Sequence, residues 1–88
     1  MRRRSLTPEE RHDRAVRMLA ARLEYLAAAE ERSTAGLRLP DEHVLAAEAA
    51  TRHAIALGLL SSEEAAAIWA HVAERHPDVA WCRARRAA

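Results

Sequence analysis

The side chains in this 88-residue chain that could bind a soft or borderline metal ion are five histidines and one cysteine. His71 and His76 are five residues apart, about 140° around a helix, so they cannot chelate one ion as a pair four residues apart does. Cys82 has no second cysteine, and Glu-x-x-His occurs only once, at Glu9 and His12. We therefore predict no metal ion and no cofactor. The remaining metal-binding alternative is a site shared between copies of the chain.

The cysteine raises the question of thiol chemistry. Cys82 is followed by Arg83, Arg85 and Arg86, and positive neighbours lower the pKa of a thiol. A reactive thiolate is one interpretation, and a cysteine that packs a terminal segment is the other. Thiol catalysis also needs a positioned base and donors to an oxyanion, and no spacing in the sequence specifies either. We expect no catalytic residue and no enzymatic activity.

Two histidines are predicted to lie near helix ends and to point toward the apolar faces of their helices. They are His43 and His76. Each is either a histidine whose hydrogen bonds are satisfied at the edge of the core or a contact that responds to pH.

The basic residues are unusual because all 14 are arginine, and the chain has no Lys, Asn or Gln. This composition is typical of codon bias in a high-GC bacterial genome. It excludes a lysine Schiff base and the side-chain amides that read DNA bases. The net charge is +1, but residues 5–82 hold eight arginines and thirteen acidic residues, a net charge of −5. The basic excess therefore lies in two short arms, which are either solvated tails or grips for phosphate or an acidic partner: Arg2, Arg3, Arg4, Arg83, Arg85 and Arg86.

The length and the apolar pattern predict a single domain without a membrane span. One cysteine excludes an internal disulfide, and no apolar run approaches the roughly 20 residues that cross a bilayer. Acidic residues follow Pro8 where a signal peptide would be apolar. We expect a soluble, cytoplasmic protein.

A start signal for a helix occurs three times, at residues 6–10, 39–42 and 60–64. A leucine precedes a capping residue or proline, and acidic residues follow, as at the positive end of a helix. Gly36 and Gly58 follow two of the runs and favour a left-handed stop. The sequence predicts an all-α protein, with helices over about residues 8–35, 41–57 and 62–76 and a short fourth helix over about 78–86.

Each predicted helix has one apolar face, so an up-down-up three-helix bundle follows. In the first helix, the seam of Val16, Leu19, Leu23 and Leu26 is too short for a sustained coiled coil. The expected core face of the second helix consists of Val44, Ala47, Ala50, Thr51, Ala54, Ile55 and Leu57. In the third, Ala65, Ile68, Trp69 and Val72 share a face. Two further expectations concern charge: Glu48 pairs with Arg52, and the solvent-facing side of the first helix carries Asp13, Arg14, Arg17, Glu24 and Glu31.

The segment 54–72 loosely resembles a DNA-binding helix-turn-helix in the separation of Ala54 and Gly58. The resemblance fails at the start of its second helix, where Glu63 and Glu64 would repel phosphates. The sequence therefore does not favour DNA reading by this unit.

Surplus apolar residues provide the better indication of function, because a three-helix monomer cannot bury every apolar direction. Met18 and Tyr25 flank the seam of the first helix, Leu45, Ala49 and Ala56 lie on the back of the second, and Trp81 lies near the chain end. The alternative is that they are alanine-rich filler with one exposed leucine. We predict a small helical protein–protein interaction module, an adaptor, regulator or inhibitor that binds a protein partner or itself as a homodimer. The alternatives are a nucleic-acid-associated regulator that uses its arginine arms and a metal or thiol protein built on His76 and Cys82.

Overall fold

The computed structural model describes residues 5–32 and 41–87, and these residues form four helices and no strand. The helices are α1 (Pro8–Glu31), α2 (Asp41–Ala56), α3 (Ser62–Arg75) and α4 (Ala80–Ala87). The all-α prediction, with three packed main helices and a short C-terminal fourth, is confirmed. α1 ends at Glu31 rather than near residue 35, and α4 begins at Ala80 rather than at residue 78. The expected start signal at Leu39 and Pro40 and the expected stop at Gly36 lie outside the described residues.

Local chemistry explains the helix ends. Glu10 N–H donates to Thr7 Oγ1 at 3.2 Å, and Thr7 N–H donates to the Glu10 carboxylate at 3.2 Å. Ser61 and Glu64 exchange the same two bonds at 3.0 and 2.9 Å. These reciprocal capping boxes satisfy amides that a helix start leaves without partners.

The α2–α3 turn forms around Gly58, the C′ residue of α2, whose φ of 74° suits glycine. Leu59 N–H donates to the Ala54 carbonyl at 2.9 Å, and Gly58 N–H donates to the Ile55 carbonyl at 3.0 Å. Together these bonds form a Schellman motif, which reverses the chain within a few residues.

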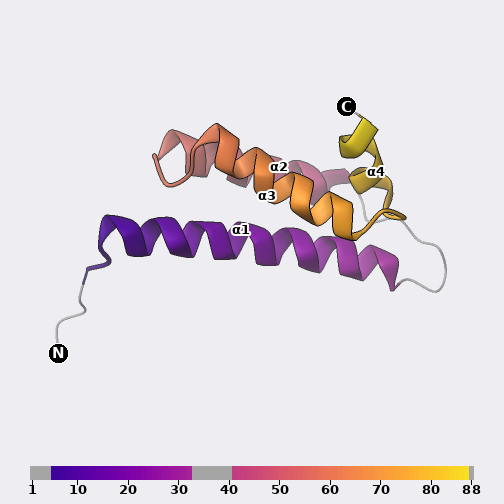
Figure 1. Ribbon diagram of the computed structural model, residues 1–88, viewed down its shortest axis with the longest axis horizontal. Helices are drawn as coiled ribbons and strands as arrows, with labels where there is room; N and C mark the ends of the chain where they lie inside the picture. Colours follow the sequence, from indigo (N-terminus) through magenta and orange to yellow (C-terminus); the bar gives the residue numbers. More distant parts are fainter. Residues whose placement is uncertain (1–4, 33–40, 88) are drawn as a thin grey trace.

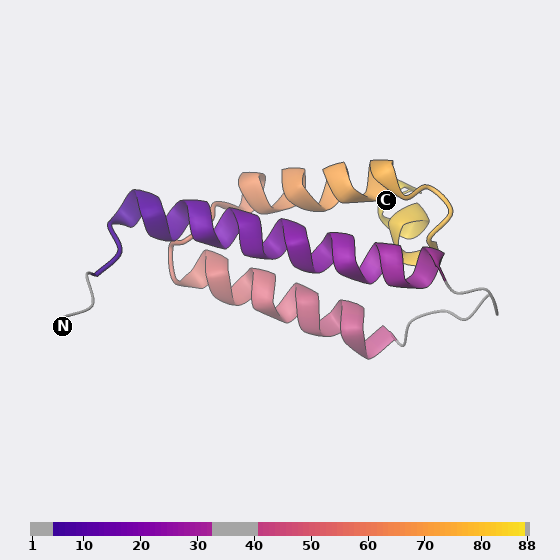
Figure 2. The same cartoon turned by 90° about the horizontal axis from the view of Figure 1, so that it is seen from below.

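The three long helices are arranged around α1. Figures 1 and 2 show α1 running along both α2 and α3, and α4 folded across the end of α3. α2 and α3 contact each other less than either contacts α1. The 24 residues of α1 span about 36 Å and the 16 of α2 about 24 Å, so the first turns of α1 extend past the α2–α3 turn (Figure 1).

The core lies between α1 and the other helices, and α4 completes it at one end. The seam leucines Leu19, Leu23 and Leu26 are buried as predicted. Other buried residues include Ala47, Leu60, Trp69, Val72, Val79 and Cys82. Two residues expected in the core face of the second helix are corrections: Ala50 is exposed on α2, and Leu57 lies beyond the last residue of α2, where the turn leaves it exposed. None of the described helices combines the length and apolar character that crossing a bilayer requires.

Candidate interaction surface

A buried histidine joins the end of α3 to α1. His76 is 8% exposed, and its ring lies between two carboxylates of α1. Nε2 is 2.7 Å from Glu24 Oε2 and Nδ1 is 2.8 Å from Glu31 Oε2. Arg75 lies 3.3 Å from the other oxygen of Glu24. Only the imidazolium can donate from both ring nitrogens, so this geometry stabilises the charged form of His76.

The cluster corrects the expectation that Glu24 faces solvent, because Glu24 is half-buried against His76, whereas Glu31 is exposed as expected while it bonds the same ring. The hydrogen bond to Glu24, followed by that to Glu31, raises the pKa of His76 above its ordinary value of 6.5. For His76, the prediction of a satisfied histidine at the edge of the core is confirmed, whereas His43 is exposed.

The same acidic side chains surround the cysteine. Cys82 is fully buried, and burial, followed by the charges of Glu30, Glu24 and Glu31, raises its thiol pKa to about 11. Glu30 also accepts a hydrogen bond from the first amide of α4, Ala80 N–H, at 3.1 Å. The thiol is therefore protonated at neutral pH and packs α4, which supports the interpretation of Cys82 as a cysteine that packs a terminal segment over that of a reactive thiolate.

A second histidine joins the exposed start of α1 to α3. The His12 imidazole contacts the Glu64 carboxylate, and this hydrogen bond raises the pKa of His12. The Ser61 backbone N–H, followed by His12, lowers the pKa of Glu64. The residues that the structure describes include no group of three or more His, Cys, Asp or Glu side chains arranged to hold a metal ion.

Trp69 is the centre of the junction between α2, α3 and α4. Its Nε1–H donates to Thr51 Oγ1 at 3.1 Å, and the Thr51 hydroxyl donates to the Ala47 carbonyl at 2.8 Å. The Trp81 ring meets it edge to face, with centroids 5.6 Å apart and planes at 80°. The Arg85 guanidinium carbon lies 3.7 Å from the Trp69 ring centroid, and Arg85 Nη2 donates to Glu48 Oε1 at 3.0 Å.

The structure contradicts two sequence predictions at this junction. Trp81, expected as an exposed anchor, is only 9% exposed because α4 folds its ring against Trp69. Glu48, expected to pair with Arg52 along α2, instead pairs with Arg85, since α4 crosses the end of α3. Arg85 thus contacts both α2 and α3, although it is exposed, as is the neighbouring Arg83. Arg2, Arg3, Arg4 and the Arg86 side chain lie outside what the structure describes.

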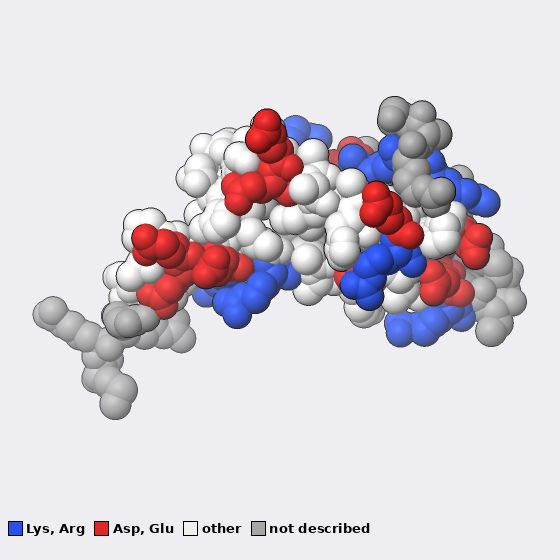
Figure 3. All heavy atoms as spheres, viewed as in Figure 1, with Lys and Arg blue, Asp and Glu red and all other residues white. Residues whose placement is uncertain are grey.

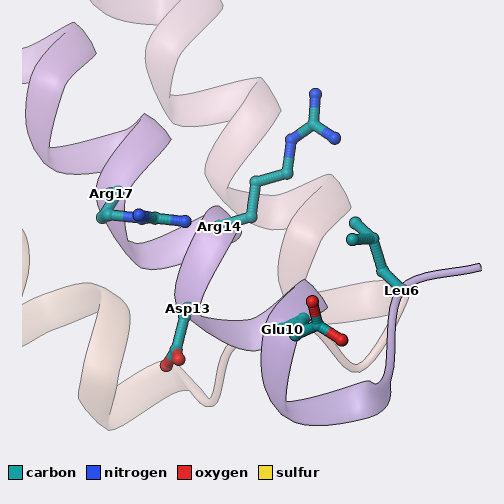
Figure 4. A pocket seen from close by; sticks show the side chains of 5 residues that line it. All are labelled: Leu6, Glu10, Asp13, Arg14 and Arg17. Atoms are coloured by element: carbon teal, nitrogen blue, oxygen red, sulfur yellow. The ribbon is translucent and has the colours of Figure 1, made fainter. Parts of the chain in front are cut away.

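A hollow on the overhanging first turns of α1 has no convergent chemistry. Its volume is about 390 Å³, and Leu6, Glu10, Asp13, Arg14 and Arg17 line it. Figure 4 shows the charged ends of these side chains pointing in different directions rather than toward one point. Figure 3 shows acidic side chains over the beginning of α1 with basic side chains beside them, and interleaved acidic and basic side chains at the opposite end. Neither end of that face gathers side chains of a single charge that would attract a ligand of the opposite charge.

The exposed apolar side chains gather on α1 and α2. Met18 is 61% exposed, Tyr25 69%, Leu45 60% and Leu57 61%. The small residues Ala49 and Ala56 of α2 are also exposed. A groove of about 300 Å³ runs beside Met18, lined by Ala15, Met18, Leu19 and Arg22 of α1, Ala50, Thr51 and Ala54 of α2, and Leu59 and Leu60 of the turn. We call this side the α1–α2 face, defined by Met18, Tyr25, Leu45, Ala49, Ala50, Ala56 and Leu57.

The structure thus places five of the six predicted interface residues at the surface and Trp81 inside. Sequence reasoning missed the groove, because its two walls belong to different helices. It also missed the Glu24–His76–Glu31 cluster. The seven-residue spacing of Glu24 and Glu31, which puts both on one side of a helix, was the available signal. No family model, curated protein or solved structure matches this chain.

Proposed function

We propose that this chain is a small helical protein–protein interaction module, an adaptor, regulator or inhibitor, whose first partner is a second copy of itself. The observation that carries the proposal is the α1–α2 face. Four large apolar side chains there are each at least 60% exposed, beside an apolar groove. Large exposed apolar side chains beside an apolar groove are typical of protein-binding sites.

The charge pattern of α2 supports a helical protein surface as the ligand. Between residues 45 and 56 the exposed positions are Leu45, Ala46, Ala49, Ala50, Arg52, His53 and Ala56, and only Arg52 carries a fixed charge. In the proposed complex, the burial of apolar side chains therefore stabilises the contact with the partner. Alanines allow a second helix to approach closely, because interaxial distance depends on side-chain size at the contact.

The order of large and small residues suits a second copy. Leu45 lies near one end of α2 and Leu57 just beyond the other, with alanines between them. In an antiparallel pair related by a two-fold axis, the leucine at each end meets the opposite end of the partner's α2, and the alanines meet in the middle. The net charge of +1 produces little repulsion between copies.

Light scattering coupled to size exclusion tests the proposal over concentrations up to about 1 mM. We expect a dimer whose dissociation constant rises at least tenfold, about 1.4 kcal/mol, in Leu45→Glu and in Met18→Glu. Ala70→Glu, which adds the same charge to an exposed position of α3, is the matched control and should leave the dimer intact. A monomer at every concentration, or equal weakening by the control, would contradict a self-association face.

A further inference from the structure

We propose that the groove between α2 and α3 is a binding site for an arginine side chain of a partner protein, and that the chain's own Arg85 occupies it in the present structure. The site lies on the side of α2 that faces α3 and α4. It does not include the α1–α2 face, and the inference goes beyond the function proposed above.

The site has the two elements that recognise a guanidinium. The face of Trp69 lies 3.7 Å from the Arg85 guanidinium carbon, and the Glu48 carboxylate accepts a hydrogen bond from Arg85 at 3.0 Å. An arginine stacks on an aromatic face and pairs with a carboxylate in its plane, which a lysine ammonium cannot do in the same way. The pocket therefore selects a planar cation.

The platform exists independently of the arginine that covers it. The Trp69 ring is fixed by its hydrogen bond to Thr51 and by the edge of Trp81, and both contacts lie within the bundle. Glu48 is on α2, a different element from the helix that supplies Arg85. A guanidinium from another molecule would meet the same preorganised groups.

The groove continues beyond Trp69 and offers room for neighbouring side chains. Its volume is about 300 Å³, and besides Glu48, Trp69 and Arg85 it is lined by Thr51, Arg52, Ile55, Ser62, Ala65 and Ala66. Ile55 and the alanines provide apolar contacts, and Arg52 repels a second cation. The ligand that fits is a segment with one arginine flanked by small apolar residues.

Arg85 can leave this site while α4 stays in place. Its side chain is 38% exposed, and an exposed ion pair or cation–π contact each changes an equilibrium constant by only about two- to fivefold. By contrast, Val79, Trp81 and Cys82, which fix α4, are 9% exposed or less. Because Arg85 is tethered, its effective concentration reaches roughly the millimolar range and suppresses weaker partners.

The test uses a capped peptide, Ala-Ala-Leu-Arg-Ala-Leu-Ala, and a matched peptide with neutral citrulline in place of arginine. Binding is followed by the NMR signal of the Trp69 Nε1–H in the full chain. We expect Arg85→Ala to bind the arginine peptide at least tenfold more tightly than the wild type. Adding Glu48→Gln to that variant should weaken binding about two- to fivefold, because one exposed ion pair is lost, and the citrulline peptide, which loses both the ion pair and the cation–π contact, should bind more weakly still. Arg83→Ala removes an exposed neighbouring arginine and should behave as the wild type.

Equal binding by Arg85→Ala and the wild type, or equal binding of the two peptides, would show that Arg85 only fastens α4 to α2. If Arg85→Ala loosens α4, Arg85→Gln retains part of the stem that packs on Trp69. The wild type itself must show the Trp69 shift at millimolar arginine peptide, and absence of that shift overturns the inference. Self-association through the α1–α2 face is measured separately and is unaffected by either outcome.

Discussion

At the residue scale, His76 and Arg75 balance the negative charges of two glutamates of α1. The imidazolium and Arg75 face Glu24 and Glu31, so two positive and two negative groups meet where α3 ends. A buried ion pair offsets its desolvation only when its hydrogen bonds are complete, and both ring nitrogens of His76 have partners. Removing one carboxylate leaves a buried donor unpaired, so the residues of this cluster depend on one another.

The raised pKa of His76 makes stability depend on pH. Its unfolded-state pKa is about 6.5, so the stabilisation is fully present below that pH and is lost as the pH rises through the higher folded-state pKa. Each unit of difference is worth about 1.4 kcal/mol. We expect the free energy of unfolding in urea to fall over this window, and the His76 ring protons to titrate above pH 6.5 by NMR.

Glu31→Gln provides the comparison for this prediction, because it removes one carboxylate and keeps the shape. We expect it to lower the folded-state pKa of His76 and to flatten the pH dependence. His12 also has a raised pKa, so His12→Gln measures its separate contribution. An unchanged His76 titration in Glu31→Gln would contradict the paired geometry.

At the element scale, Thr51 connects two helices that otherwise touch little. Its hydroxyl joins the indole of Trp69 on α3 to the backbone of α2. Thr51→Val keeps the shape but leaves the buried Trp69 N–H without an acceptor, which should cost about 1–3 kcal/mol of unfolding free energy. Thr51→Ser keeps the hydroxyl and should preserve the protection of the Trp69 N–H against hydrogen exchange. Equal protection in the two variants would contradict the role of the hydroxyl.

The elements could be predicted from sequence because their signals are local. The boxes Thr7–Glu10 and Ser61–Glu64 and the glycine at position 58 act within one turn of chain. The pairing of side chains from different helices depends on how the helices rotate against one another. For that reason the sequence alone predicts a Glu48–Arg52 pair rather than the Glu48–Arg85 pair.

For the candidate interaction surface, helical periodicity likewise predicts only what is decided within one helix. It identified the outward residues of α1 and α2, such as Tyr25 and Leu45, because each direction is set within a single helix. It failed for Trp81 because the burial of that ring is decided by where α4 docks. The α1–α2 groove was missed for the same physical reason, since two helices are needed to form it.

At the scale of the whole molecule, a thin core accounts for the uncovered face. α1 packs on both α2 and α3, while α2 turns much of its surface outward and carries few charges there. Burying a large apolar side chain contributes about 1.5–3 kcal/mol, so covering Met18, Tyr25, Leu45 and Leu57 would be a substantial gain. In the proposed dimer, a second copy covers part of this apolar surface.

Residue-resolved NMR over a concentration series up to about 1 mM is the most direct measurement of this claim. We expect the methyl signals of Met18, Leu45 and Leu57 to shift together as the protein associates, while the Ala70 methyl signal on α3 stays constant. Methyl signals of the α1–α2 face that stay constant while those of another surface move, or no movement anywhere, would contradict it.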